Sequence, residues 1–187
     1  MLSPKTLLPL CCSLILLLVC SCDFLTDENF NTSQGLTDTF VTLNVNGSYA
    51  GSGDGGLAVI TSTGDSITSL NVTRSDESIR IVDSLNNQYV GTIGFPTSQI
   101  DASQALIPAD TVLATVDFSA SGVDGSANST VTITGAFSLI SNNFASNEGS
   151  VDTRILFSGD WLETSTGTNA VIQATRNGGV RNLSDFY

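Results

Sequence analysis

The chain has 187 residues, with 18 acidic and six basic side chains, four cysteines and no histidine. This length allows one ordinary domain or two small ones, and the net charge of −12 disfavours nucleic acid and anionic lipid headgroups as partners. Without histidine, the Ser-His-Asp triad, the Cys-His pair and every histidine-containing zinc site are excluded.

The first 22 residues have the pattern of an export signal. Lys5 lies in a short positive region, and residues 6–19 form an apolar run that is too short for a membrane-spanning helix but typical of a signal-peptide core. The run ends in VCSC at 19–22, which resembles the lipobox of bacterial lipoproteins, with Cys20 where Ala, Ser or Thr is usual. A cleaved secretory signal with incidental cysteines is the alternative interpretation.

The lipobox resemblance implies that residues 1–21 are a signal peptide and that Cys22 carries a diacylglyceryl thioether, usually with an acylated amine. Three acyl chains exceed the two signals needed for stable anchoring. The mature protein is then expected to be exported and anchored in a bacterial membrane, facing the periplasm or the outer surface. All four cysteines lie within the first 22 residues, so the mature domain has no thiol left for a disulfide.

Residues 22–38 are expected to form an acidic, flexible tether. They contain Asp23, Asp27, Glu28 and Asp38 among Asn, Thr and Gly and show no clear periodicity. About 16 residues of flexible chain span roughly 20–24 Å root-mean-square, which lifts the following domain off the headgroups. Beyond residue 21 the chain keeps all 18 acids against five arginines, a balance that favours cations, basic proteins or simple solubility.

From residue 39 to residue 187 apolar and polar side chains alternate with period two, which indicates half-buried antiparallel strands. The clearest runs are 39–46, 111–119, 129–139 and 153–163, and weaker ones are 57–62, 66–73, 78–83, 87–94 and 169–176. Turn-forming residues separate the runs. The pattern predicts an all-β domain, a single antiparallel meander of about eight to nine strands that forms a small barrel or a barrel-like sandwich.

One stretch, residues 96–110, breaks this rhythm. Asp101 is suited to cap a short helical turn over 102–106, and Pro108 would end it. We therefore expect this segment to cross from one part of the sheet to another.

Acidic turns make calcium the one cofactor that the sequence suggests, because calcium takes carboxylate and carbonyl oxygens. In a meander alternate turns share an end, which would group Asp54, Asp76 and Glu77 at one end and Asp65 with Asp83 at the other. The sequence has no EF-hand-type loop, and ordinary turn formation by aspartate explains each of these residues without a metal. No cofactor is therefore predicted.

Trp161, the single tryptophan, is in phase with the apolar side of its run and is expected either to fill the core or to offer a stacking platform for a sugar or peptide. Tyr49 and Tyr89 share this ambiguity. The glutamates, including Glu163, are expected to be solvated surface carboxylates. The five arginines are expected to pair with acids on the surface: Arg74, Arg80, Arg154, Arg176 and Arg181.

Three short segments, 116–118, 124–126 and 133–137, are similar to the barrel domains of transferrin-binding-protein-type surface lipoproteins. This resemblance covers about 30 residues of β sequence. The lysine-rich binding surfaces of that group are absent from this chain, so no functional residue is carried over.

These observations together predict a lipid-anchored cell-envelope protein that is a non-catalytic binding module for a protein or a glycan. A structural envelope spacer is one alternative, and a small carboxylate-based glycoside hydrolase is another. A barrel mouth lined by Trp or Tyr would favour binding over the spacer. Two carboxylates about 5–10 Å apart in a cleft would favour the hydrolase.

Overall fold

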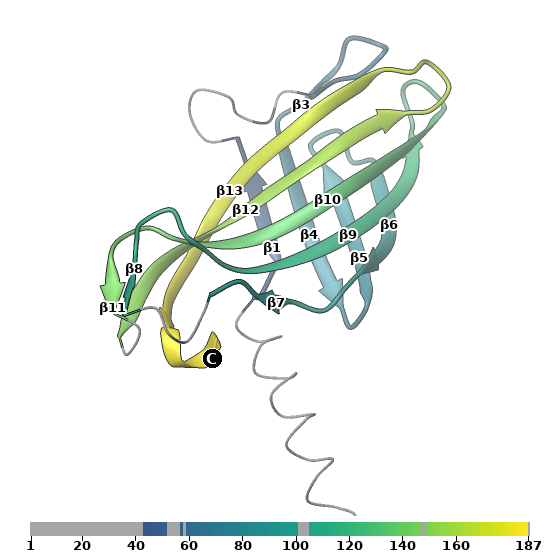
Figure 1. Ribbon diagram of the computed structural model, residues 1–187. Coiled ribbons are helices and arrows are strands. Elements are labelled where there is room, and N and C mark those ends of the chain that lie inside the picture. Colours follow the sequence, from purple (N-terminus) through teal and green to yellow (C-terminus); the bar gives the residue numbers. More distant parts are fainter. Residues whose placement is uncertain (1–42, 52–56, 58, 101–104, 147–148, 187) are drawn as a thin grey trace, which may run out of the picture. The chain divides into compact units, whose positions relative to one another are not determined.

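The computed structural model describes residues 43–51, 57, 59–100, 105–146 and 149–186 (Figure 1). The predicted signal peptide and tether, with Cys22, lie outside these residues, as do Asp54 and Asp101. The described residues form thirteen strands and a short 3-10 helix: β1 (Gly47–Ala50), β2 (Val59–Ile60), β3 (Ser66–Ile67), β4 (Ser69–Ser75), β5 (Ser78–Asp83), β6 (Gln88–Ile93), β7 (Thr97–Ser98), β8 (Leu106–Ile107), β9 (Val112–Asp124), β10 (Ser129–Ser141), β11 (Ala145–Ser146), β12 (Ser150–Glu163), β13 (Asn169–Asn182) and η1 (Leu183–Phe186).

Eight of these strands close into an antiparallel barrel (Figure 1). Their order around the barrel is β1, β4, β5, β6, β9, β10, β12 and β13, and β13 pairs back to β1 through Thr175 and Ala50. The predicted all-β meander is therefore confirmed, and it is a barrel. Closure depends on pairing between the two ends of the meander, which the alternation of side chains does not encode.

The first predicted strand, 39–46, is wrong in its placement, because residues 43–46 precede β1 and the strand begins at Gly47. Leu43 and Val45 are nevertheless buried, as the alternation predicted. In residues 43–46, hydrogen bonds from side chains take the place of the backbone hydrogen bonds of a strand. The Tyr49 hydroxyl donates to the Val45 carbonyl at 2.8 Å, and the Arg176 guanidinium donates to the Asn44 carbonyl.

The expectation for residues 96–110 is also wrong. This segment connects β6 and β9, which are hydrogen-bonded neighbours in the barrel, so it does not cross the sheet. Leu106 lies in β8 and not in a helical turn. β7 pairs with β9 through Thr97 and Thr115, past the last residue of the shorter β6, because β9 runs on beyond its neighbour.

Large and small side chains share the same rows across the barrel interior. One inward-facing row, read across paired strands, contains Ile93, Phe118, Gly135, Gly159 and Ile172. At Gly135 an added Cβ would lie 2.1 Å from the Ser158 carbonyl oxygen, so this close approach of two strands requires glycine.

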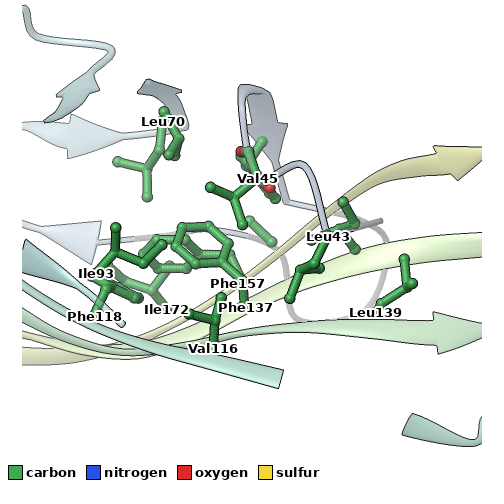
Figure 2. Packing of buried hydrophobic residues seen from close by; sticks show 14 of the residues in the cluster. Leu43, Val45, Leu70, Ile93, Val116, Phe118, Phe137, Leu139, Phe157 and Ile172 are labelled. Atoms are coloured by element: carbon green, nitrogen blue, oxygen red, sulfur yellow. Dashed lines mark hydrogen bonds between the residues drawn. The ribbon is translucent and has the colours of Figure 1, made fainter. Parts of the chain in front are cut away.

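Four aromatic rings form the centre of the core. Phe137 and Phe157 have centroids 5.0 Å apart, and Phe118 and Tyr49 lie 5.0–6.0 Å from both of them. Figure 2 shows Phe137 and Phe157 side by side between Ile172 and Val116. Such pairs contribute about 0.5–1.5 kcal/mol each beyond area burial. Because side chains fill this interior, binding positions have to be sought at the two ends and on the outer wall.

The two ends of the barrel carry different features. At one of them, the carboxylate end, lie the β2–β3 hairpin and the turns after β5, β9 and β12, with buried Asp83, Asp124 and Glu163. At the other, the ribbon end, the described chain begins at residue 43 and the two-stranded β8–β11 ribbon extends past β10.

Candidate functional site

Trp161 lies in the barrel interior with only 1% of its surface exposed. The inward-facing row that contains it also contains Gly91, Ala120 and Ala170, small residues that leave room for the indole. Tyr49 and Tyr89 are fully buried as well. The structure thus places these three aromatic side chains in the core, where they line no exposed barrel mouth.

Asp83 caps the turn at residues 84–87. Its Oδ1 accepts hydrogen bonds from the backbone amides of Leu85 and Asn87, both at 2.9 Å, and its Oδ2 accepts one from the Tyr89 hydroxyl at 2.7 Å. Burial and this hydrogen bond to a carboxylate both raise the pKa of Tyr89. The phenol therefore stays protonated and donates to Asp83, so the carboxylate has a structural role.

Asp124 holds the turn after β9 in the same way, since its Oδ1 accepts from the Ser126 amide at 2.9 Å. Its Oδ2 is buried and has no hydrogen-bond partner among the described residues. The Trp161 indole interacts with the Tyr89 hydroxyl and slightly opposes the rise in the pKa of Tyr89. The carboxylate end therefore contains one unsatisfied acceptor among its described interior groups.

Glu163 is fully buried, so the expectation of a solvated carboxylate is wrong for this residue. The Ser62 hydroxyl donates to Oε1 at 2.6 Å and the Ser62 amide donates to Oε2 at 3.2 Å. The hydrogen bond from this hydroxyl is the largest cause that lowers the pKa of Glu163. Glu163 lies two positions after Trp161, so strict alternation along β12 would have placed it on the inner face.

Asp54 lies outside the described residues, and the other acidic residues proposed for calcium form no metal-binding group. Asp76 and Glu77 form the exposed β4–β5 turn, whereas Asp65 accepts a hydrogen bond from the Thr63 hydroxyl in the β2–β3 loop. The oxygens of Asp83 are occupied by its own turn. In the part of the chain that the structure describes, no group of three or more His, Cys, Asp or Glu side chains could hold a metal ion.

The outer wall of the barrel near the carboxylate end is a better candidate for a binding surface than the filled interior. Two outward-facing rows cross β6, β9, β10, β12 and β13, and Val123 and Thr130 extend them toward the turns. We call this surface the hydroxyl face: Val90, Ser121, Thr132, Leu162 and Asn169 in one row, Thr92, Ser119, Thr134, Asp160 and Val171 in the next, and Val123 with Thr130.

The hydroxyl face combines exposed apolar side chains with hydroxyl groups. Val90, Val123, Leu162 and Val171 are 42–68% exposed, Asp160 is the one charged member of the face, and exposed Arg80 pairs with Val90 at its edge. Depletion of charge around exposed apolar side chains is typical of the centre of protein interfaces. The sequence analysis missed this surface because its members come from five strands that only the barrel brings together.

Arg176 is not the surface charge partner that the sequence suggested. Its Nε donates to the Tyr49 hydroxyl at 3.2 Å, and its guanidinium lies over the Tyr49 ring at 5.6 Å from the centroid. Arg154 does pair with an acid, since its Nη2 lies 2.6 Å from Asp110 Oδ1. Arg176 therefore fastens β13 to β1, where the barrel closes.

Comparisons with known proteins give no match to this chain among family models, curated proteins or solved structures. Within the described ranges, no helix has the length and apolar character needed to cross a membrane.

Proposed function

We propose that this chain is an exported, lipid-anchored protein of the cell envelope and that its hydroxyl face binds another protein. The observation that carries the proposal is the composition of this face. A chain with 18 acids and six basic residues presents here a wall of valine, leucine, serine and threonine with Asp160 as its one charge. A surface that served only solubility would be expected to show the acidic surplus of the whole chain.

A protein partner is favoured over a glycan by the placement of the aromatic residues. Sugar recognition by stacking would use an exposed Trp or Tyr, whereas Trp161, Tyr49 and Tyr89 are buried. The engagement of Asp83 and Glu163 by turns and by Ser62 also favours binding over a carboxylate-based hydrolase. Both carboxylates are buried and already accept hydrogen bonds from the chain itself.

The anchor is tested by radiolabelled palmitate in cells that express the full chain. Wild-type protein is expected to incorporate the label and to sediment with membranes, and Cys22→Ala is expected to lose both properties. Labelling that survives the Cys22→Ala substitution would refute the lipid anchor.

The binding face is tested by placing a photo-crosslinking residue at Thr130, on the hydroxyl face, and in a matched variant at Thr73, on β4 in the opposite wall. Both positions are exposed. A discrete cross-linked product from Thr130 that is absent from Thr73 is expected, and Leu162→Asp should abolish it. Equal products from both positions, or none from either, would favour the spacer.

A further inference from the structure

The β8–β11 ribbon exposes large apolar side chains on one side. The ribbon pairs Ile107 with Ala145 and Leu106 with Ser146. Ile107 and Ala145 belong to the core, whereas Leu106 is 56% exposed and Phe144, directly before β11, is 69% exposed. Because successive strand residues face opposite sides, Leu106 and Phe144 lie together on the solvent side.

The ribbon is fixed to the end of β10 by hydrogen bonds. The Ser141 hydroxyl donates to the Pro108 carbonyl at 2.7 Å, and the Ser141 amide donates to the Thr111 carbonyl at 2.9 Å. Two further apolar side chains, Val112 and Val180, are exposed at this end and pair there with Ile140 and Asp152. The apolar side of the ribbon is thus held on a rigid base.

The described chain begins at this same end. Leu139 pairs with Ile155, Ile155 pairs with Arg176, and Arg176 donates to the Asn44 carbonyl. Leu43 and Leu139, both labelled in Figure 2, belong to the same buried core cluster. Because β10 ends two residues beyond Leu139 and the ribbon follows, residue 43 lies at the ribbon end.

Charges of both signs lie near the ribbon, and the sequence adds two acids there, Glu148 two residues after β11 and Asp185 in η1. Asp110 and Arg154 form an ion pair. Asp152 at the start of β12 and Arg181 near the end of β13 add one charge of each sign. These two residues lie near each other, because Val151, which precedes Asp152, pairs with Arg181. An apolar surface with a small acidic surplus is suited to an uncharged lipid surface and not to an anionic one.

We propose that the ribbon end rests on the lipid bilayer and inserts Leu106 and Phe144 into the boundary between headgroups and acyl chains. This inference rests on the proposed lipid anchor at Cys22. The tether predicted over residues 22–38 would span roughly 20–24 Å, so the anchored domain would sample the bilayer at high effective concentration. Under that condition two large apolar side chains suffice to populate the docked orientation.

The test uses the full lipidated chain in vesicles of zwitterionic phosphatidylcholine. Ser146→Cys places a thiol on the exposed side of the ribbon and leaves Leu106 and Phe144 in place, and the other thiols have left with the signal peptide or carry lipid. An environment-sensitive fluorophore on this thiol is expected to be quenched by lipid-borne quenchers. In the matched control, Thr130→Cys on the hydroxyl face, the fluorophore is expected to show the emission of an aqueous environment and no quenching by lipid.

Leu106→Ser combined with Phe144→Ser, on the Ser146→Cys background, should lower the docked fraction about tenfold for each side chain removed. Vesicle flotation, which reports the lipid anchor, should be unchanged. A chain that floats while the Ser146 label reads water overturns the bilayer contact alone, and a chain that does not float overturns the anchor and the contact together. Quenching that appears only at high protein density would assign the ribbon to a second copy of the chain and would also overturn the contact.

Discussion

The two ends of the barrel bury polar groups by different means. At the carboxylate end, Asp83, Asp124 and Glu163 are buried and accept hydrogen bonds from turn amides and hydroxyls. At the ribbon end, Arg176 and Tyr49 satisfy the backbone before β1, and apolar side chains remain exposed. The carboxylate end is therefore closed by its own turns, whereas the ribbon end presents exposed apolar side chains that a membrane or another molecule could cover.

The largest effect is expected from Trp161→Ala. The indole fills the core beneath the carboxylate end, so its removal should lower the free energy of unfolding by about 3–5 kcal/mol. Its neighbour Leu162 points outward, and Leu162→Ala should change stability by no more than about 0.5 kcal/mol. Denaturant unfolding of both variants checks this, and similar losses in the two would contradict the inward placement of Trp161.

A smaller loss, about 1–3 kcal/mol, is expected from Tyr49→Phe, because Val45 and Arg176 lose their shared partner in a buried site. The ring and its contacts with Phe137 and Phe157 remain, so the loss isolates the hydroxyl. Thermal unfolding followed by circular dichroism measures it. A variant as stable as wild type would show that closure at the ribbon end does not depend on this hydrogen bond.

The same hydroxyl gives a signature at alkaline pH. Burial raises the pKa of Tyr49 from 10.0 to about 12, although Arg176 opposes this shift. The folded chain therefore keeps a proton that the unfolded chain releases, and stability should be lost as the pH rises from about 10 toward 12. Tyr49→Phe should remove that part of the loss, which tyrosinate absorbance and unfolding at each pH would show.

Glu163, at the carboxylate end, should give a smaller change in stability than Tyr49, and this change should appear at acidic instead of alkaline pH. Its pKa is lowered below the usual 4.5, chiefly by the hydroxyl of Ser62. The stabilisation is then present above the usual value and is lost as the pH falls through the folded value. Unfolding between neutral and acidic pH should show a shallower loss in Glu163→Gln than in wild type, with Glu77→Gln in the exposed turn as the control.

The smallest effect is expected at the ion pair between Arg154 and Asp110. Its geometry is good at 2.6 Å, but Asp110 is 77% exposed. A double-mutant cycle with Arg154→Ala and Asp110→Ala should give a coupling of about 0.2–1 kcal/mol that weakens with added salt. A coupling energy that does not change with salt would indicate that water does not reach this ion pair, and would contradict the exposed ribbon end described above.

Alternation along the chain determined more of this protein than any motif. Leu43, Val116, Phe137, Phe157 and Trp161 are all buried on the side that the period-two pattern assigned. The same alternation would have placed Glu163 inside the barrel. Glu163 was instead predicted to be solvated, because glutamate side chains are usually exposed. The long stretch 96–110 could not be placed from sequence, because its course depends on β9 running past the shorter β6.

The sequence by itself determined an all-β meander whose side chains alternate between core and solvent, because that alternation is local to each strand. Only the tertiary structure decided that the meander closes, that Asp83, Asp124 and Glu163 gather at one end, and that Leu106 and Phe144 stand exposed at the other. These features depend on register and strand length across neighbouring strands. The lipid anchor, the binding face and the bilayer contact are proposals that combine both kinds of information.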